Sequence, residues 1–303
     1  MKKKKAARSA EEAAPPPVRC VALTKRFGEH TVLDGVDLDC RERETNVIIG
    51  GSGAGKTTLL RLLIGLEKPT SGRVEIDGVD IAPLSERALN EVRHKFGMCF
   101  QYAALLDSLT IFDNVAFPLR EHTSLSEKEI RAKVRDKLVA LGLESRVEDL
   151  YPAEVSGGMR KRVGLARALM LDPKIIIYDE PTSGLDPITT HTVDEMIEQA
   201  RRDFGVTNVV ISHDMASTFR IAHRVHVLVR GKIVASGTPQ EVLECGRDDV
   251  REFIEASGVD TANVHRIGKD SADAPAASQP HVELPTGEPP TGEPPTGEPP
   301  AEP

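Results

Sequence analysis

The residues best able to do chemistry form a glycine-rich segment over 50–57, Gly-Gly-Ser-Gly-Ala-Gly-Lys-Thr. It fits the P-loop pattern, in which glycines let backbone N–H groups turn towards a phosphate. Lys56 would reach the β- and γ-phosphates of a nucleotide, and the hydroxyl of Thr57 would hold Mg²⁺. A helix beginning near Lys56 would add its N-terminal dipole, whereas the alternative is a glycine-rich turn without a ligand. The residues predicted to contact the nucleotide here are Gly50, Gly51, Ser52, Gly53, Ala54, Gly55, Lys56, Thr57 and Thr58.

A P-loop needs an acidic partner for its metal ion, and Asp179 ends the apolar run 174–178 at the position where such a residue belongs. Glu180 follows directly and is placed to orient and deprotonate an attacking water. An Asp-Glu pair alone is common. At the end of a buried strand, in a chain with a P-loop, it indicates nucleotide hydrolysis.

Short apolar segments are the elements that must position these residues. The expected strands cover 18–23, 36–39, 45–49, 174–178 and 208–212. The last two are continuous apolar runs, typical of strands covered on both faces of a parallel sheet. A polar stretch over about 121–170 has helical periodicity and is expected to form an inserted subdomain. Strands alternating with helices predict an α/β fold.

Composition narrows the class of protein. The chain has 303 residues and a net charge of −8, which argues against a dedicated nucleic-acid binder. No apolar run approaches the ~18–20 residues that span a bilayer. The basic start, residues 1–5, lacks the apolar segment of a signal peptide, so we expect a cytoplasmic protein. The four cysteines have no metal spacing and are expected to be free thiols, with a disulfide or zinc framework as the alternative.

Composition also divides the chain into a folded part, 18–265, and two tails. Residues 1–17 are basic and then rich in alanine and proline, so a disordered tail is expected. Residues 266–303 carry two basic and seven acidic side chains and no aromatic, and they end in three copies of Thr-Gly-Glu-Pro-Pro. Such a segment cannot bury a core and is expected to be disordered and extended, with docking to another protein as the alternative. An amphipathic helix is expected within about 246–258.

Residues 155–159, Val-Ser-Gly-Gly-Met, lie upstream of Asp179 and resemble the signature motif of ABC ATPases. Ser156 can cap a helix, and Gly157 and Gly158 would expose the first N–H groups of that helix. The alternative is an ordinary loop. The periodic residues behind the motif, interpreted as the core face of the helix, are Met159, Val163, Ala166 and Met170.

The remaining motifs of ABC-type ATPases follow in order along the chain. Gln101 fits the glutamine of the Q-loop, and Asp186 ends a segment that fits the D-loop. His213 fits the switch histidine, which contacts the γ-phosphate in the family. Phe27 fits the aromatic residue that stacks on adenine, with core packing as its alternative. The resemblance covers about 18–245 and implies a P-loop NTPase with a RecA-like core, an antiparallel β subdomain and a helical subdomain over about 102–165.

The chain also resembles a narrower group, the Mla/Mce phospholipid-transport ATPases. The resembling stretches are residues 97–101, 112–122, 156–162 and 186–189. Met159 stands where most ABC importers have glutamine. The chain departs from the group in both tails and in Val155, where leucine is usual.

This resemblance implies a head-to-tail homodimer with two composite ATP sites. Lys56, Gln101, Glu180 and His213 would carry catalysis, and Thr57, Gln101 and Asp179 would hold Mg²⁺. The second copy would contribute Ser156, Gly157 and Gly158. The implied partners are a membrane permease like MlaE, an MCE protein and a STAS-domain subunit, at the cytoplasmic face of the inner membrane, with no nucleic acid.

Two other functions compete with phospholipid transport. One is the ATPase of an importer for amino acids or other small solutes, and the other is a soluble ABC ATPase acting on ribosomes or DNA. The single P-loop and the lack of a long coiled-coil insertion argue against the second. The segment between Gln101 and Glu121 is expected to form the groove that receives a permease helix. Its hydrophobic residues either line this groove or pack in the core, and they are Leu105, Leu106, Phe112 and Phe117.

Overall fold

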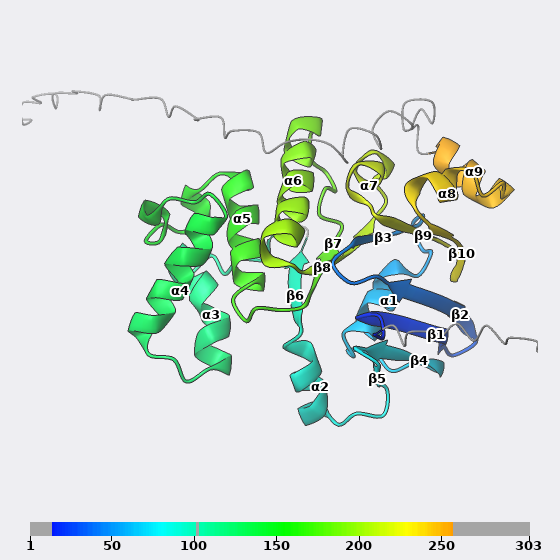
Figure 1. Cartoon of the computed structure of the whole chain (residues 1–303), viewed down its shortest axis with the longest axis horizontal. Helices are drawn as coiled ribbons and strands as arrows, with labels where there is room; N and C mark the ends of the chain where they lie inside the picture. The colour runs from blue at the N-terminus through cyan, green and yellow to red at the C-terminus, as the bar shows by residue number, and fades with distance from the viewer. Residues whose placement is uncertain (1–13, 101–102, 257–303) are drawn as a thin grey trace, which may run out of the picture.

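The computed structural model describes residues 14–100 and 103–256, and its central layer is a six-stranded sheet (Figure 1). In spatial order its strands are β10 (Lys232–Gly237), β9 (Arg224–Val229), β3 (Thr45–Ile49), β8 (Thr207–Ser212), β7 (Ile175–Asp179) and β6 (Phe96–Phe100). All neighbours pair in parallel except β10 and β9. The predicted α/β fold with a parallel core is confirmed.

A second, antiparallel sheet lies beside the first. It contains β2 (His30–Cys40), β1 (Val18–Phe27), β4 (Ser71–Ile76) and β5 (Val79–Asp80). The first two strands are longer than the predicted 18–23 and 36–39. A two-residue loop pairs Phe27 with His30 and continues the ladder to the tip of the hairpin.

Three helices form a lobe on one side of the central sheet: α3 (Ile111–His122), α4 (Glu127–Ala140) and α5 (Gly157–Ala168) (Figure 1). Two short 3-10 helices, η1 (Ser145–Val147) and η2 (Pro152–Glu154), join α4 to α5. The helical structure begins at Ile111, ahead of the predicted 121, because the hydroxyl of Thr110 caps α3 by accepting a hydrogen bond from the Asp113 N–H at 3.1 Å.

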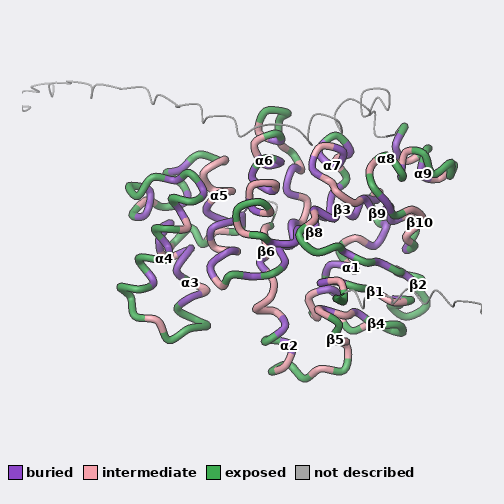
Figure 2. Tube along the Cα trace, in the orientation of Figure 1, coloured by how far each residue is buried: buried purple, intermediate pink, exposed green. Residues whose placement is uncertain are grey.

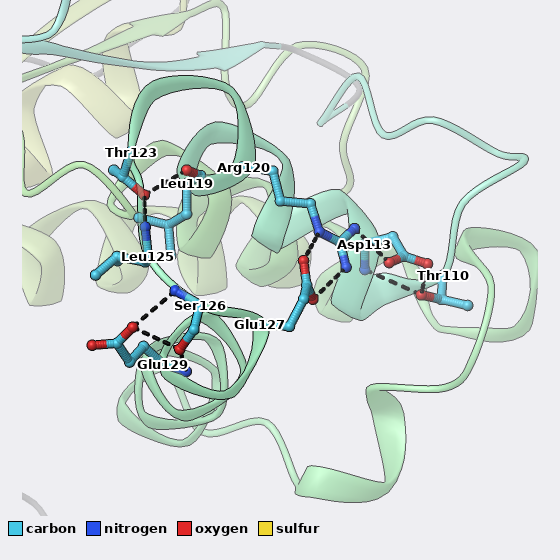
Figure 3. A network of polar contacts seen from close by, with 9 residues as sticks. All are labelled: Thr110, Asp113, Leu119, Arg120, Thr123, Leu125, Ser126, Glu127 and Glu129. Atoms are coloured by element: carbon cyan, nitrogen blue, oxygen red, sulfur yellow. Dashed lines mark hydrogen bonds and ion pairs between the residues drawn. The ribbon is translucent and has the colours of Figure 1, made fainter.

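Charged side chains fix the joint between α3 and α4 (Figure 3). The Arg120 guanidinium bonds both carboxylate oxygens of Glu127, at 2.8 and 3.0 Å, and reaches Asp113 at 2.8 Å. Ser126 and Glu129 form a capping box at the start of α4. The orientation of α3 relative to α4 is therefore held by the Arg120–Glu127 pair, which is the contact here that joins the two helices.

The remaining helices surround the sheets. They are α1 (Lys56–Leu63), α2 (Glu86–Arg93), α6 (Pro187–Phe204), α7 (Met215–Ile221), α8 (Pro239–Leu243) and α9 (Asp248–Ala256). The α9 helix lies inside the predicted range 246–258 and buries Val250 and Ile254. Met170 is buried but lies two residues beyond Ala168, the last residue of α5, so the predicted helical stripe extends past the end of the helix.

Each central strand separates two hydrophobic cores, because its side chains alternate between the two faces of the sheet. Val47 and Ile49 pack with the helical lobe and α6, whereas Ile48 packs with α1 and the antiparallel sheet. The same alternation holds in β7, where Ile176 and Tyr178 face one core and Ile175 and Ile177 the other. Buried segments accordingly follow the sheet through the middle of the molecule in Figure 2.

The four cysteines are all described and all free, as predicted. Burial raises the pKa of the Cys40 and Cys99 thiols to about 12, so both stay protonated and unreactive. Within 14–100 and 103–256, no helix combines the length and the apolar character that a membrane span needs. The predicted C-terminal tail, 266–303, lies outside the described part of the chain. Residues 1–13 of the predicted N-terminal tail also lie outside it.

Candidate nucleotide site

The glycine-rich loop connects the end of β3 to the start of α1, as the P-loop pattern requires. Two glycines are needed for close packing. A Cβ on Gly50 would lie 2.4 Å from the carbonyl oxygen of Leu228, and one on Gly55 would lie 2.7 Å from Leu33 Cδ2. Gly55 also has φ +107°, a backbone conformation that favours glycine. The loop is therefore shaped by its contacts with β9 and β2, while Ser52, Gly53 and Thr57 stay exposed.

Lys56 lies at the centre of the site. Its ammonium donates hydrogen bonds to the carbonyl oxygens of Gly50 at 2.8 Å and Gly51 at 3.3 Å. It also lies 3.4 Å from Glu180 Oε1, with 12% of the side chain exposed. A phosphate bound in the loop would compete with these oxygens for the same ammonium group.

Glu180 follows β7 and is held from several sides. Its N–H donates to the Ile211 carbonyl at 2.9 Å, and its Oε2 lies 2.6 Å from His213 Nδ1 and accepts from the His213 N–H at 3.2 Å. The residue has φ +49°, which is the left-handed region that non-glycine residues seldom adopt. The structure thus brings together three predicted catalytic residues, Lys56, Glu180 and His213, from the ends of three parallel strands. Gln101, the fourth, lies outside the described residues.

Asp179 and Thr57 supply the oxygen donors that fit Mg²⁺. Burial raises the pKa of the Asp179 carboxyl, the adjacent Glu180 charge raises it further, and Lys56 lowers it in part. A divalent cation would offset this crowding of negative charge. Mg²⁺ keeps several waters and substrate phosphate ligands, so one carboxylate and one hydroxyl suit it. No cluster of three or more His, Cys, Asp or Glu side chains suited to a metal occurs in the described part of the chain.

The predicted signature motif starts α5, in the helical lobe and away from α1 (Figure 1). Ser156 caps this helix, and its hydroxyl accepts from the Met159 N–H at 3.3 Å. A Cβ on Gly158 would meet nothing within 4 Å, and one on Gly157 only the end of Arg160 at 3.8 Å. Neither glycine is therefore required by packing against the described residues of this chain.

The other residues predicted to bind the nucleotide are Asp186, Phe27 and Thr58. Asp186 caps α6 by accepting from the Ile188 and Thr189 N–H groups at 3.0 and 3.1 Å. Phe27 ends β1 with 48% of its surface exposed, which excludes core packing. Lys25 Nζ lies 4.7 Å from the centre of its ring. Thr58 is half-buried in the first turn of α1.

A groove of about 780 Å³ lies between α2, α3, α5 and β6, and part of it comes from the segment predicted to receive a permease helix. Leu106 and Phe117 line it and are each 46% exposed. Phe112 is buried in the core, and Leu105 packs against that core. Sequence reasoning missed the walls from α2 and α5, including His94 and Arg167, because no motif marks them.

The parallel sheet, the P-loop and the acidic pair at the end of β7 define a P-loop ATPase of the ATP-binding cassette class. The profile of the ABC transporter family matches residues 33–183. The chain belongs to the ATP-binding subunits of ABC transporters, and it is an ATPase.

Three relatives illustrate the range of this family. The chain is 41% identical to the intermembrane phospholipid transport system ATP-binding protein MlaF of Haemophilus influenzae, over 77% of this chain and 88% of that protein. It is 42% identical to the probable ribonucleotide transport ATP-binding protein mkl of Mycobacterium leprae, over 81% and 68%. It is also 42% identical to the methionine import ATP-binding protein MetN of Caulobacter vibrioides, over 80% and 73%.

Solved structures agree with the fold. A dimeric ATP-binding cassette bound to ADP and Pi is 33% identical, with a TM-score of 0.64, and the match covers 73% of this chain and 98% of that one. The cassette cbiO1 of Clostridium perfringens is 27% identical with a TM-score of 0.71, covering 86% and 100%.

Proposed function

We propose that this chain powers the movement of phospholipid between membranes by hydrolysing ATP. The observation that carries the hydrolytic part is the position of Glu180, which contacts both Lys56 and His213 at the end of the parallel strands. Lys56 binds the β- and γ-phosphates, Glu180 accepts the proton of the attacking water, and His213 contacts the γ-phosphate. Gln101 completes the set. Thr57, Gln101 and Asp179 would hold Mg²⁺, which would supply positive charge to offset that of the phosphates.

The nucleotide lies between two copies of the chain in this proposal. The P-loop, residues 50–57, Thr58 and Phe27 of one copy hold ATP, while Ser156, Gly157, Gly158 and Asp186 close the site from the other. Two observations support the arrangement: no described residue packs closely enough on Gly157 and Gly158 to require glycine there, and a similar cassette bound to ADP and Pi is dimeric. ATP closes the dimer and hydrolysis reopens it.

Phospholipid is the proposed cargo because of the resemblance to MlaF, which covers 88% of that relative's length. The residues that differ from most importers, Met159 and 186–189, lie in the segments that meet the second copy. A permease like MlaE, an MCE protein and a STAS-domain subunit are the proposed partners, and the inner-membrane surface facing the cytoplasm is the proposed location. The proposed ATPase domain is 18–265, with its helical subdomain at about 102–165 and tails on either side.

Import of a small solute is the second candidate, because the methionine importer subunit MetN is equally similar, at 42% identity. Reconstitution in liposomes with the permease that co-purifies with this subunit distinguishes the two. Transfer of a fluorescent phospholipid by the wild-type subunit, and not by Lys56→Ala, supports the proposal. Activation of the permease by a soluble binding protein loaded with an amino acid would contradict it.

A further inference from the structure

The β1–β2 hairpin, which carries Phe27 near its tip, is held against the P-loop. Its strands pair Phe27 with His30 and Lys25 with Leu33. Leu33 packs on the loop, since its Cδ2 lies 2.7 Å from the position of a Cβ on Gly55. The strand pairing therefore places Lys25 and Phe27 beside the loop that would hold the phosphates.

The segment that follows α1 also binds this hairpin. The Thr70 hydroxyl accepts a hydrogen bond from the Arg26 N–H at 3.0 Å, and the Thr70 N–H donates to the Thr24 carbonyl at 2.8 Å. Glu67, in the same segment, is tied to α1 because its N–H donates to the Arg61 carbonyl at 3.2 Å. Since α1 begins where the P-loop ends, the hairpin is supported near both ends of this helix.

Lys25 connects these contacts to the ring of Phe27. Its ammonium donates hydrogen bonds to Glu67 Oε2 and to the Lys68 carbonyl oxygen, both at 2.8 Å, and it lies 4.7 Å from the centre of the Phe27 ring. A cation over the face of an aromatic ring is attracted to the ring electrons. The Lys25 side chain is 12% exposed, whereas Phe27 is 48% exposed. The ammonium therefore holds the ring from within the chain and leaves much of its surface available to a ligand.

Stability of the fold does not by itself explain this arrangement. The hydrogen bond from Lys25 lowers the pKa of the Glu67 carboxyl, so the pair is charged at neutral pH. Partly exposed ion pairs nevertheless contribute little to stability. A base that stacks on Phe27 needs the ring in a fixed orientation, and a phenylalanine has no polar atom by which a hydrogen bond could fix it. The ammonium of Lys25 supplies that constraint.

We propose that Lys25 is a positioning residue, which orients Phe27 so that a purine base stacks on the ring while the phosphates of the same nucleotide occupy the P-loop. A ring that is already oriented loses less freedom when the nucleotide binds, and affinity rises accordingly. The inference rests on the proposed stacking of adenine on Phe27. Lys25 itself does not touch the nucleotide, so its removal should affect only those ligands that carry a base.

Binding of ADP and of ribose 5-diphosphate, which lacks the base, to the full chain tests the proposal. Phe27→Leu should weaken ADP binding about tenfold, because the base loses its stacking partner. Lys25→Met should weaken it about fivefold, and both variants should bind ribose 5-diphosphate as the wild type does. The double variant should bind ADP no more weakly than Phe27→Leu, because Lys25 acts through the ring. Calorimetric titration measures each affinity.

Two further variants serve as controls. Lys25→Arg keeps a cation over the ring and should restore the affinity for ADP. Lys68→Met removes a neighbouring exposed charge and keeps the backbone carbonyl, so its affinity for ADP should equal that of the wild type. Melting temperatures identify a variant that has not folded. If Lys25→Met is such a variant, Lys25→Gln, which can still donate to the Lys68 carbonyl, takes its place.

An equal loss of affinity for ADP and ribose 5-diphosphate in Lys25→Met would indicate a general distortion of the site and overturn the proposal. A further loss when this change is combined with Phe27→Leu, or failure of Lys25→Arg to restore the affinity, would also overturn it. Phe27→Leu without effect on ADP would contradict the proposed role of Phe27 and the inference with it. Weak binding of ADP by Phe27→Leu together with normal binding by Lys25→Met would overturn the inference alone.

Discussion

At the nucleotide site Lys56 lies beside the carboxylate of Glu180, whereas in the groove Arg167 meets no carboxylate of the described chain. Glu180 in turn contacts His213, so the charged groups of the nucleotide site are partners of one another. The groove has the opposite arrangement, because among the described residues its half-buried Arg167 guanidinium bonds two backbone carbonyl oxygens and no carboxylate. A site that binds a free ligand can exchange internal partners for the ligand, while a surface with an uncompensated charge is suited to a protein partner.

Removing the cation of the nucleotide site should have the largest effect. Lys56→Ala eliminates the phosphate contact, so we expect ATP binding to weaken and turnover to fall below detection, a loss of more than ~1000-fold. Lys68→Ala, an exposed lysine of the same region, is the matched control and should be normal. ATP hydrolysis and nucleotide binding by the purified proteins measure both. Detectable turnover by Lys56→Ala would remove the contrast between this lysine and Arg167.

Replacing Glu180, the carboxylate beside Lys56, should separate ATP binding from ATP hydrolysis. Glu180→Gln keeps the shape but cannot accept a proton, so kcat should fall about 100- to 1000-fold while ATP binding remains. The variant should accumulate as a closed dimer with ATP, visible by size-exclusion chromatography. Glu195→Gln, on the exposed side of α6, controls for the loss of a charge. Normal turnover by Glu180→Gln would exclude Glu180 as the base.

Apolar side chains allow a similar comparison between two surfaces. The α9 helix covers one of them, whereas the groove beside α3 is open. Val250 and Ile254 of α9 are buried against the rest of the chain. Truncation after residue 245 removes both side chains and should lower the free energy of unfolding by about 3 kcal/mol. Truncation after 265 should leave it unchanged. Phe117→Ala, in the open groove, should change it by less than about 1 kcal/mol. Equal melting temperatures for the two truncations would contradict the first expectation.

His226 differs from both Lys56 and Arg167, because burial keeps its imidazole neutral. Only 1% of it is exposed, and burial lowers its pKa to about 3. Because the unfolded chain binds a proton near pH 6.5, this group's contribution to stability is present above that pH and is lost as the pH falls towards 3. From pH 7 to 5 the loss is about 2 kcal/mol.

The control for this prediction is His226→Gln, compared with the wild type at each pH. Asp194 has its pKa raised to about 6 by burial and acts in the opposite direction, but it is common to both proteins. The difference between the two curves therefore isolates His226. Chemical unfolding at pH 7 and 5 measures it, and parallel curves would contradict the prediction.

The nucleotide site could be predicted from sequence because its residues follow strands directly. Asp179, Glu180 and His213 come at or directly after the ends of buried apolar runs, and Lys56 is joined to another such run by the glycine-rich loop. Parallel strands bring these ends together. The groove could not be predicted in the same way. Phe112 and Phe117 are five positions apart on one helix, and only the placement of α4 and α5 decides which one is buried.

The left-handed backbone of Glu180 has a consequence for how the protein could change over generations. A glutamate at φ +49° is less stable than a glycine or asparagine there by about 1 kcal/mol. Selection for thermal resistance alone should therefore replace this glutamate, and only selection for ATP turnover should retain it. A variant library sorted once for heat tolerance and once for growth dependent on transport should diverge at position 180 before it diverges in the surrounding core.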